Sequence, residues 1–259
     1  MVDIATAIGA STLVFVVATL AFLAWTRRLP AACRRYGYAA TAAVGVMAIA
    51  YVGMTAIEFV IGGNTDLARF LGYTGMWIPI VYVTSAIAGV DRRAALLLLA
   101  IVLGRVWITL VGYLLDGIAG QIASLLPFAL LIAGVYLLYG PFTRVAASRS
   151  GDRSLLFTKL KHLIVLGWIG LVINGLIAAD GLGLVDDFVA LLTLVYVEAI
   201  LLLGFAGLVL RNVDALEAAA EEGRLRSSRT DTNLEERRRA ETAETAETVE
   251  TAESVETGD

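Results

Sequence analysis

The sequence predicts an all-α integral membrane protein built as a bundle of seven transmembrane helices. Of its 259 residues, 58% are hydrophobic and 17% are charged. A soluble domain is usually about 45–50% apolar, glycine included, and about 25% charged. The apolar residues also gather in seven long runs, and the strongly polar residues gather at the C-terminal end. These features exclude a water-soluble globule.

Each predicted span is an apolar run close to the roughly 20 residues that cross a bilayer as a helix. Charges or turn residues interrupt the chain between the runs. The first run has no basic leader and no small-residue cleavage site, so we interpret it as a span and not as a signal peptide. The predicted helices are 4–26, 36–61, 67–90, 94–115, 120–142, 158–179 and 187–211.

Lysine and arginine lie after the first, third, fifth and seventh runs, which places them at one side of the membrane. Cytoplasmic loops carry an excess of these residues. We therefore expect the N-terminus outside, the C-terminus in the cytoplasm and the whole chain in the plasma membrane. The most basic of these loops is predicted between the fifth and sixth helices, with Arg144, Arg149, Arg153, Lys159 and Lys161.

The chain is predicted to have two parts. Residues 1–215 form the bundle, and residues 216–259 form a charged, acidic cytoplasmic tail that ends in a Glu-Thr-Ala repeat. Such low-complexity segments bury little apolar surface, so we expect disorder there. A solubilising tail is the preferred interpretation over a docking arm.

Few residues of the chain suggest a disulfide, a redox site, a metal site or catalysis. Cys33 is the one cysteine and His162 the one histidine, so a disulfide framework, a redox pair and a metal site are not expected. No arrangement of Ser, His and Asp and no phosphate loop is present, and we expect no enzyme activity. The net charge of −4 is concentrated in the tail and gives no reason to expect nucleic-acid binding.

Several motifs resemble the microbial (archaeal) rhodopsins, with haloarchaeal sensory rhodopsin and bacteriorhodopsin as the nearest members. The resemblance covers all seven spans. It implies the seven-helix fold, a haloarchaeal membrane and a central retinal pocket. Its motifs are Ala68–Phe70, Ile80–Tyr82, Ala88–Asp91, Tyr136–Thr143 (YLLYGPFT), Leu160–Trp168 (LKHLIVLGW), Asp180–Val185, Leu194–Glu198 (LVYVE) and Gly204–Gly207.

The sequence departs from that family where its chemistry lies. Members attach retinal to a lysine four residues after an aspartate in the last helix, and here these positions are Leu202 and Glu198. The lysines of the chain are Lys159 and Lys161. We therefore expect no covalent retinal and no cofactor, with the identity of any other apolar or amphipathic ligand open.

The positions of the pump carboxylates also differ. The resemblance places the proton acceptor at Gly72 and the donor at Val83, so light-driven pumping is not expected. The remaining positions that would surround the chromophore form a predicted former pocket. These are Tyr73, Met76, Trp77, Arg105, Trp168, Leu171, Gly175, Glu198 and Leu202.

Arg69, Arg105 and Glu198 lie inside predicted spans as a buried charge network. A charge at that depth is costly and normally faces the bundle interior, where it is paired. The preferred interpretation is an ancestral interhelical pair of Arg69 and Glu198. The alternatives are a pocket in which Arg105 and Glu198 share the former chromophore space, and a path for ions or water.

These features predict a retinal-free opsin homologue that acts as a non-photochemical membrane receptor or interaction subunit. The alternatives are a sensory photoreceptor that binds retinal non-covalently and a passive channel for ions or small solutes. Besides the lipid bilayer, the expected partners are a transducer-like membrane protein or a second copy of the chain. Tyr196 matches a tyrosine of the transducer face in the sensory branch and marks the possible partner surface.

Overall fold

The protein is a bundle of long helices. The computed structural model describes residues 4–223 except 62, 116 and 180. Within that part of the chain, seven helices are long and apolar enough to cross a membrane and no strand occurs, which confirms the predicted fold class. The elements are α1 (Ile4–Arg27), α2 (Arg34–Ala56), η1 (Ile57–Ile61), α3 (Asp66–Ala88), α4 (Arg92–Leu114), α5 (Gly117–Leu137), η2 (Leu138–Phe142), α6 (Thr143–Ala147), α7 (Gly151–Ile177) and α8 (Asp187–Arg211).

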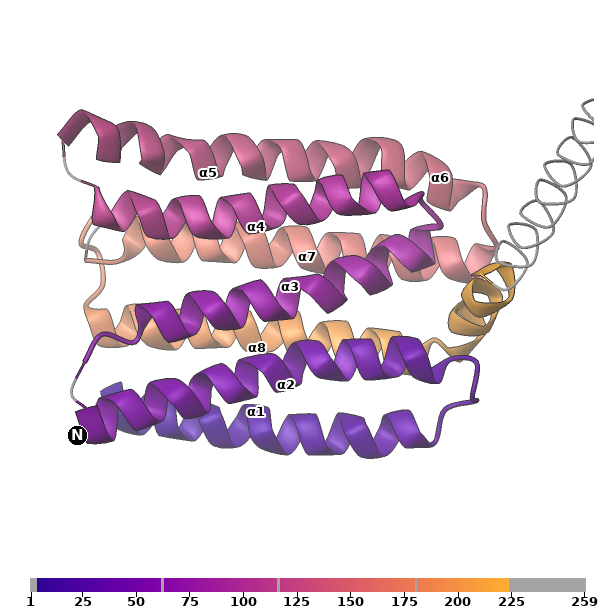
Figure 1. Ribbon diagram of the computed structural model, residues 1–259, viewed down its shortest axis with the longest axis horizontal. Helices are drawn as coiled ribbons and strands as arrows, with labels where there is room; N and C mark the ends of the chain where they lie inside the picture. The colour runs from indigo at the N-terminus through magenta and orange to yellow at the C-terminus, as the bar shows by residue number, and fades with distance from the viewer. Residues whose placement is uncertain (1–3, 62, 116, 180, 224–259) are drawn as a thin grey trace, which may run out of the picture. The chain divides into compact units, whose positions relative to one another are not determined.

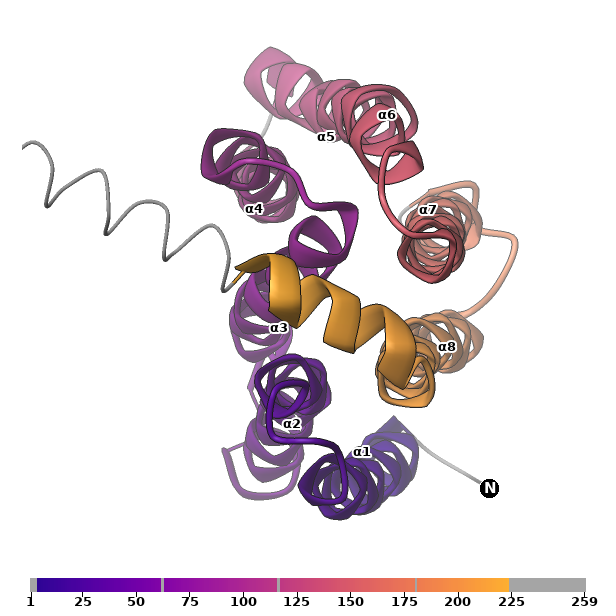
Figure 2. The same ribbon diagram turned by 90° about the vertical axis from the view of Figure 1, so that its right-hand side faces the viewer.

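The long helices run roughly side by side, and short connections join neighbours at alternate ends (Figure 1). Neighbours in sequence pack together, as α1 does on α2 and α4 on α5. Helix α8 closes the bundle by packing against α1, α2 and α7, and α7 also contacts α3. Seen from one end, the helices surround a shared interior (Figure 2). The largest fully buried side chains include Trp168, Tyr51, Phe15, Phe142, Phe157 and Phe205.

Aspartate caps set the start of two spans. The Asp91 carboxylate accepts a hydrogen bond from the Ala94 amide at 3.1 Å, and Asp186 accepts one from Val189 at 2.8 Å. Each cap satisfies one of the free amides in the first turn of a helix. These caps fix the first residues of α4 and α8.

Two π-helical turns interrupt the α-helical geometry of the predicted spans 36–61 and 120–142. The first span is α-helical to Ala56 and then continues as η1. The second passes from α5 into η2, which contains Pro141, and continues as α6. A proline has no amide hydrogen to donate, and a π-turn accommodates this break while the helix goes on.

Helix α7 begins at Gly151, whereas the sequence predicted a start at 158. Lys161, near the start of the predicted span, is 5% exposed, and Arg153, which was predicted to lie in the basic loop before it, is in the helix and 4% exposed. The error came from treating charge as a sign of a loop. Long basic side chains can bury their stems and direct their charged ends to polar groups at the end of a bundle.

Two arginines of the predicted basic loop, Arg149 and Arg153, hold the C-terminal end of α3. Arg153 donates from Nε to the Ile87 carbonyl at 3.1 Å and from a terminal nitrogen to the Ala86 carbonyl at 3.0 Å. Arg149 donates to the Gly89 carbonyl at 2.9 Å. The last carbonyls of a helix lack partners within the helix and carry partial negative charge. We call Arg149, Arg153 and these three carbonyls the α3 clamp.

The chain divides into two units, Met1–Ala218 and Ala219–Asp259. Residues 213–223, which include the first part of the predicted tail, are helical. The predicted disorder of the tail concerns residues that lie beyond 223, outside the described part. The proposed domain boundary after residue 215 stays a prediction.

Candidate functional site

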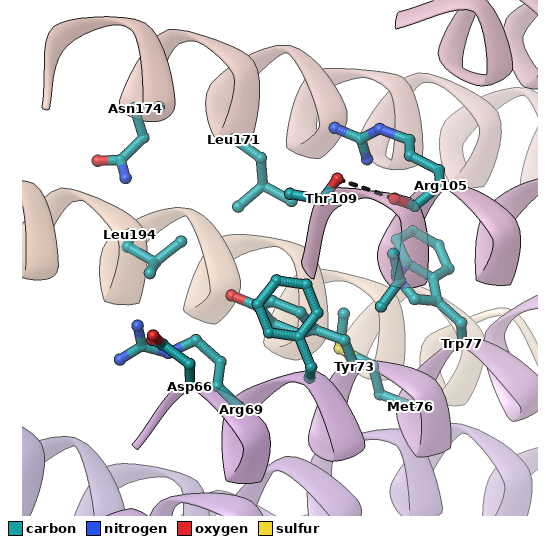
Figure 3. Close-up of a pocket in the computed structure, with 13 residues that line it drawn as sticks. Asp66, Arg69, Tyr73, Met76, Trp77, Arg105, Thr109, Leu171, Asn174 and Leu194 are labelled. Atoms are coloured by element: carbon teal, nitrogen blue, oxygen red, sulfur yellow. Dashed lines mark hydrogen bonds between the residues drawn. The ribbon is translucent and has the colours of Figure 1, made fainter. Parts of the chain in front are cut away.

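A cavity of about 570 Å³ opens between α3, α4, α7 and α8 (Figure 3). Its lining comes from α3, α4 and α7, and α8 contributes Leu194. Six of the residues predicted to surround the chromophore line it, and they come from the consecutive helices α3 and α4 and from α7. They are Tyr73, Met76, Trp77, Arg105, Leu171 and Gly175.

The other three predicted residues lie outside the lining. Trp168 is 1% exposed and packs against Trp77, with 5.7 Å between ring centroids. Leu202 is fully buried in α8, and Glu198 is 2% exposed. The positions predicted to surround the chromophore therefore divide into a cavity wall and a packed layer behind it.

Glu198 is held by two tyrosines. The Tyr51 hydroxyl donates to its Oε2 at 2.5 Å, and the Tyr73 hydroxyl donates to its Oε1. Tyr51 comes from α2 and stacks on Phe15 of α1 at 5.0 Å between centroids. A buried carboxylate is tolerated when its oxygens accept hydrogen bonds. Glu198 thus joins α2, α3 and α8 through hydroxyl groups.

Arg69 occupies one end of the cavity together with Asp66 (Figure 3). Its Nε is buried and has no hydrogen-bond partner within the described part of the chain. The expected pairing of Arg69 with Glu198 is not needed to satisfy the carboxylate, because both oxygens already accept from tyrosines. The pairing itself stays a prediction.

Arg105 lies at the other end, on α4. The Thr109 hydroxyl donates to the Arg105 backbone carbonyl at 2.8 Å, which leaves the guanidinium out of that bond. The guanidinium lies between α4 and α7 (Figure 3). Among the described residues it has neither a hydrogen bond nor an ion pair. Since Glu198 is outside the lining, the cavity does not bring these two charges together.

The polar residues of the site that sequence reasoning missed include Asn174 and Tyr51. Asn174 lines the cavity from α7, is 8% exposed, and its Oδ1 has no hydrogen-bond partner within residues 4–223. Tyr51 supplies the second donor to Glu198. A signal existed for both, because an amide or a hydroxyl deep in an apolar span normally has a partner or a ligand.

Two glycines show where the site has room. A Cβ on Gly175 would meet nothing within 4 Å, so this position opens into the cavity. A Cβ on Gly72 would lie 2.6 Å from Ala50 Cβ and 3.0 Å from Met47 Sδ. Gly72 therefore faces α2 at close approach, and a carboxylate there would require α2 and α3 to move apart.

Tyr196 lies away from the cavity. It is 67% exposed and lines a second, almost wholly apolar hollow of about 620 Å³ between α1 and α8. Phe15, Leu192 and Val195 line the same hollow. Its role as a partner surface stays a prediction.

Known proteins resemble this chain in sequence and in fold. No family model matches the chain. Sensory rhodopsin-2 of Natronomonas pharaonis is 27% identical over 224 residues, which are 85% of this chain and 91% of that protein.

Solved rhodopsins share the fold. The thermophilic rhodopsin of Rubrobacter xylanophilus superposes with a TM-score of 0.76 at 22% identity, over 84% of this chain and 99% of that one. Bromide-bound halorhodopsin of Halobacterium salinarum gives 0.74 at 18% identity, over 83% and 95%. At these identities the likeness concerns the fold.

These comparisons correct one expectation. We predicted that the protein has no cofactor, and this is wrong, because the proteins to which it is similar are retinal-binding rhodopsins. The physical reason for the error is that we inferred an empty pocket from one attachment residue, whereas a cavity can hold a ligand by its walls.

The predicted membrane location is confirmed: seven spans in the rhodopsin arrangement make this a multi-pass protein of the plasma membrane. The chain is a homologue of sensory rhodopsin-2 with the fold of the microbial rhodopsins.

Proposed function

We propose that the protein is a membrane receptor of the sensory rhodopsin type, and neither a light-driven pump nor an enzyme, which holds a retinoid non-covalently in the cavity between α3, α4, α7 and α8. The observation that carries this proposal is the cavity itself. Six of its lining residues stand at positions predicted to surround a chromophore, and its volume of about 570 Å³ falls within the roughly 300–1,000 Å³ of small-molecule sites.

Non-covalent binding fits the residues present. An imine needs a primary amine, the lysines of the chain are Lys159 and Lys161, and Leu202 is packed behind the wall. The apolar faces of Met76, Trp77 and Leu171 can enclose a polyene. When bound, retinal supplies light absorption; the protein supplies the enclosing walls.

The absence of pumping is supported by the packing at two positions. Gly72 faces Ala50 and Met47 with no space for an acceptor carboxylate. Val83, at the donor position, is an aliphatic residue that is fully buried. Glu198 has both oxygens engaged by tyrosine hydroxyls. A proton relay along α3 has no carboxylate to move through at either position.

A titration with all-trans-retinal tests ligand binding. Trp77 lines the cavity, so tryptophan fluorescence of the purified protein should be quenched in a saturable manner. Gly175→Leu should weaken binding by filling the open space. Gly53→Leu is the matched control, since a Cβ at Gly53 also meets nothing within 4 Å but lies on α2 away from the cavity. Equal binding by both variants would contradict the proposal.

A second measurement tests the statement about pumping. Vesicles that contain the retinal-loaded protein should show no light-driven change of external pH, with and without a protonophore. A protonophore-sensitive pH change would contradict it.

The interaction part of the proposal concerns α8. A transducer-like membrane protein or a second copy of the chain would contact the face that carries Tyr196, which is 67% exposed. A photo-crosslinking residue at 196 should give a discrete product in native membranes. Ile132 on α5, 70% exposed, is the matched control position. The same yield at both positions would contradict a specific face.

A further inference from the structure

We infer that the natural ligand of this cavity is an apolar monocarboxylate whose carboxylate binds the Arg105 guanidinium. This inference rests on the proposed function, because it concerns the same cavity. It adds the chemical class of the ligand and the residue that selects it.

The first support is the charge of Arg105. Its guanidinium lies between α4 and α7 and has no hydrogen-bonded or ion-paired partner in the described part of the chain (Figure 3). Among the described residues that line the cavity, the one carboxylate is that of Asp66, which lies at the opposite end beside Arg69. A charge at this depth is normally paired. An anionic ligand would complete the pair.

The second support is independent of Arg105. Asn174 is 92% removed from solvent, by its 8% exposure, and its Oδ1 has no partner within residues 4–223. It lines the same cavity and points from α7 toward it (Figure 3). Arg69 Nε is a second buried polar atom without a partner at this wall. Buried polar atoms without a partner in the protein indicate a polar group or water in the space beside them. Oδ1 accepts hydrogen bonds, so water or a hydroxyl group would complete it, whereas the Arg69 Nε donor can bind an anion.

The rest of the wall is apolar and defines the body of the ligand. Met76, Trp77, Val106, Leu171 and Leu194 line the space between the polar groups. Such a wall favours an elongated hydrocarbon, because burial of apolar surface contributes about 25 cal/mol for each Å². A small inorganic anion would satisfy Arg105 but leave most of this wall uncovered.

A carboxylate is the anion that fits this combination. It accepts two parallel hydrogen bonds from a guanidinium in the fork geometry that arginine provides. An aldehyde or an alcohol on the same hydrocarbon accepts hydrogen bonds but brings no charge to offset Arg105. The cavity should therefore prefer the acid form of a polyene to its alcohol.

The experiment compares three probes by equilibrium binding to the purified full-length protein: all-trans-retinoic acid, all-trans-retinol and palmitic acid. Retinoic acid should bind at least about tenfold more tightly than retinol, which corresponds to about 1.4 kcal/mol. Arg105→Gln should remove this preference for the acid over the alcohol. Arg105→Lys should retain part of it.

Arg92→Gln is the matched control, because Arg92 is an exposed arginine at the start of the same helix. It should leave the preference unchanged. If Arg105→Gln does not fold, the comparison of acid with alcohol on the unmodified protein still decides the question. Equal affinity for acid and alcohol overturns the inference.

The outcomes also separate this inference from the proposed function. Binding of retinol and retinal without preference for the acid overturns the inference and supports a retinoid receptor. Binding of palmitate that depends on Arg105, with no retinoid bound, supports the carboxylate site and overturns the retinoid proposal. Tight binding of both acids, each lost in Arg105→Gln, supports the carboxylate site and leaves the hydrocarbon unselective.

Discussion

Arg153 and Arg105 carry the same guanidinium into the bundle but meet different surroundings. Arg153 is 4% exposed and donates to two carbonyls at the end of α3. Arg105 lines a cavity and has no such partner among the described residues. The first is a structural contact that the protein completes by itself. The second is incomplete within the chain, and this difference separates a packing role from a binding role.

The largest effect is expected at the α3 clamp. Arg153→Met should remove two hydrogen bonds and leave the Ala86 and Ile87 carbonyls without partners. We expect a loss of about 2–4 kcal/mol in the free energy of unfolding, because a buried acceptor without a partner costs about 1–3 kcal/mol. Reversible unfolding in detergent measures it. Lys159→Met, an exposed position on the same helix, is the control and should be close to neutral. Equal losses of stability in Arg153→Met and Lys159→Met would show that the hydrogen bonds of Arg153 do not stabilise the protein.

The next effect concerns Glu198, whose oxygens are satisfied as fully as the carbonyls of the clamp. Tyr51→Phe removes the donor to Oε2 and should destabilise the protein by about 1–3 kcal/mol. Tyr38→Phe is the matched control, since Tyr38 is on the same helix and 44% exposed. If both variants unfold at the same denaturant concentration, Glu198 does not depend on the Tyr51 hydroxyl.

Two glycines, one at the α3 clamp and one on the cavity wall, provide a third contrast. Gly89 ends α3 with φ of +74°, and a Cβ there would lie 2.5 Å from Arg149 Nε. Gly89→Ala should cost about 1–2 kcal/mol from backbone strain alone. Gly175→Ala, in open space on the cavity wall, should instead stabilise α7 by up to about 1 kcal/mol. Melting temperatures that shift in the same direction for both variants would contradict the contrast.

The smallest effect is expected at Arg105 in the ligand-free protein. Arg105→Met removes no hydrogen bond of the guanidinium within residues 4–223, so stability should change by less than about 1 kcal/mol. Its effect should also add to that of Glu198→Gln within about 0.5 kcal/mol, as expected for sites that share no partner. Tyr73 with Glu198 serves as the positive control for coupling. A strong coupling of Arg105 to Glu198 would place the two charges in one network.

The bundle could be predicted from the sequence because each span carries its own signal, an apolar run of sufficient length. The start of α7 could not, because the partners that accommodate the buried Arg153 there are the carbonyls of Ala86 and Ile87, 67 and 66 residues earlier in the chain. Charge counted along the chain does not reveal a partner on another helix.

The candidate site could be predicted from the sequence only in part. The resemblance identified the positions around the ligand, and six of them line the cavity. It could not separate Arg105, which faces the cavity, from Glu198, which lies behind Tyr73. That separation depends on the rotation of α8 relative to α3, which is a property of packing and not of spacing.

The α3 clamp also has a consequence for the order of assembly during synthesis. The carbonyls at the end of α3 leave the ribosome long before Arg153, which follows Ile87 by 66 residues. Until then water must hydrate them, so this end of α3 must stay at the membrane surface while α4 and α5 insert. Docking of the first turn of α7 replaces that water. Stalled chains that stop before residue 153 should therefore show rapid amide exchange near Gly89, and chains that include α7 should show protection.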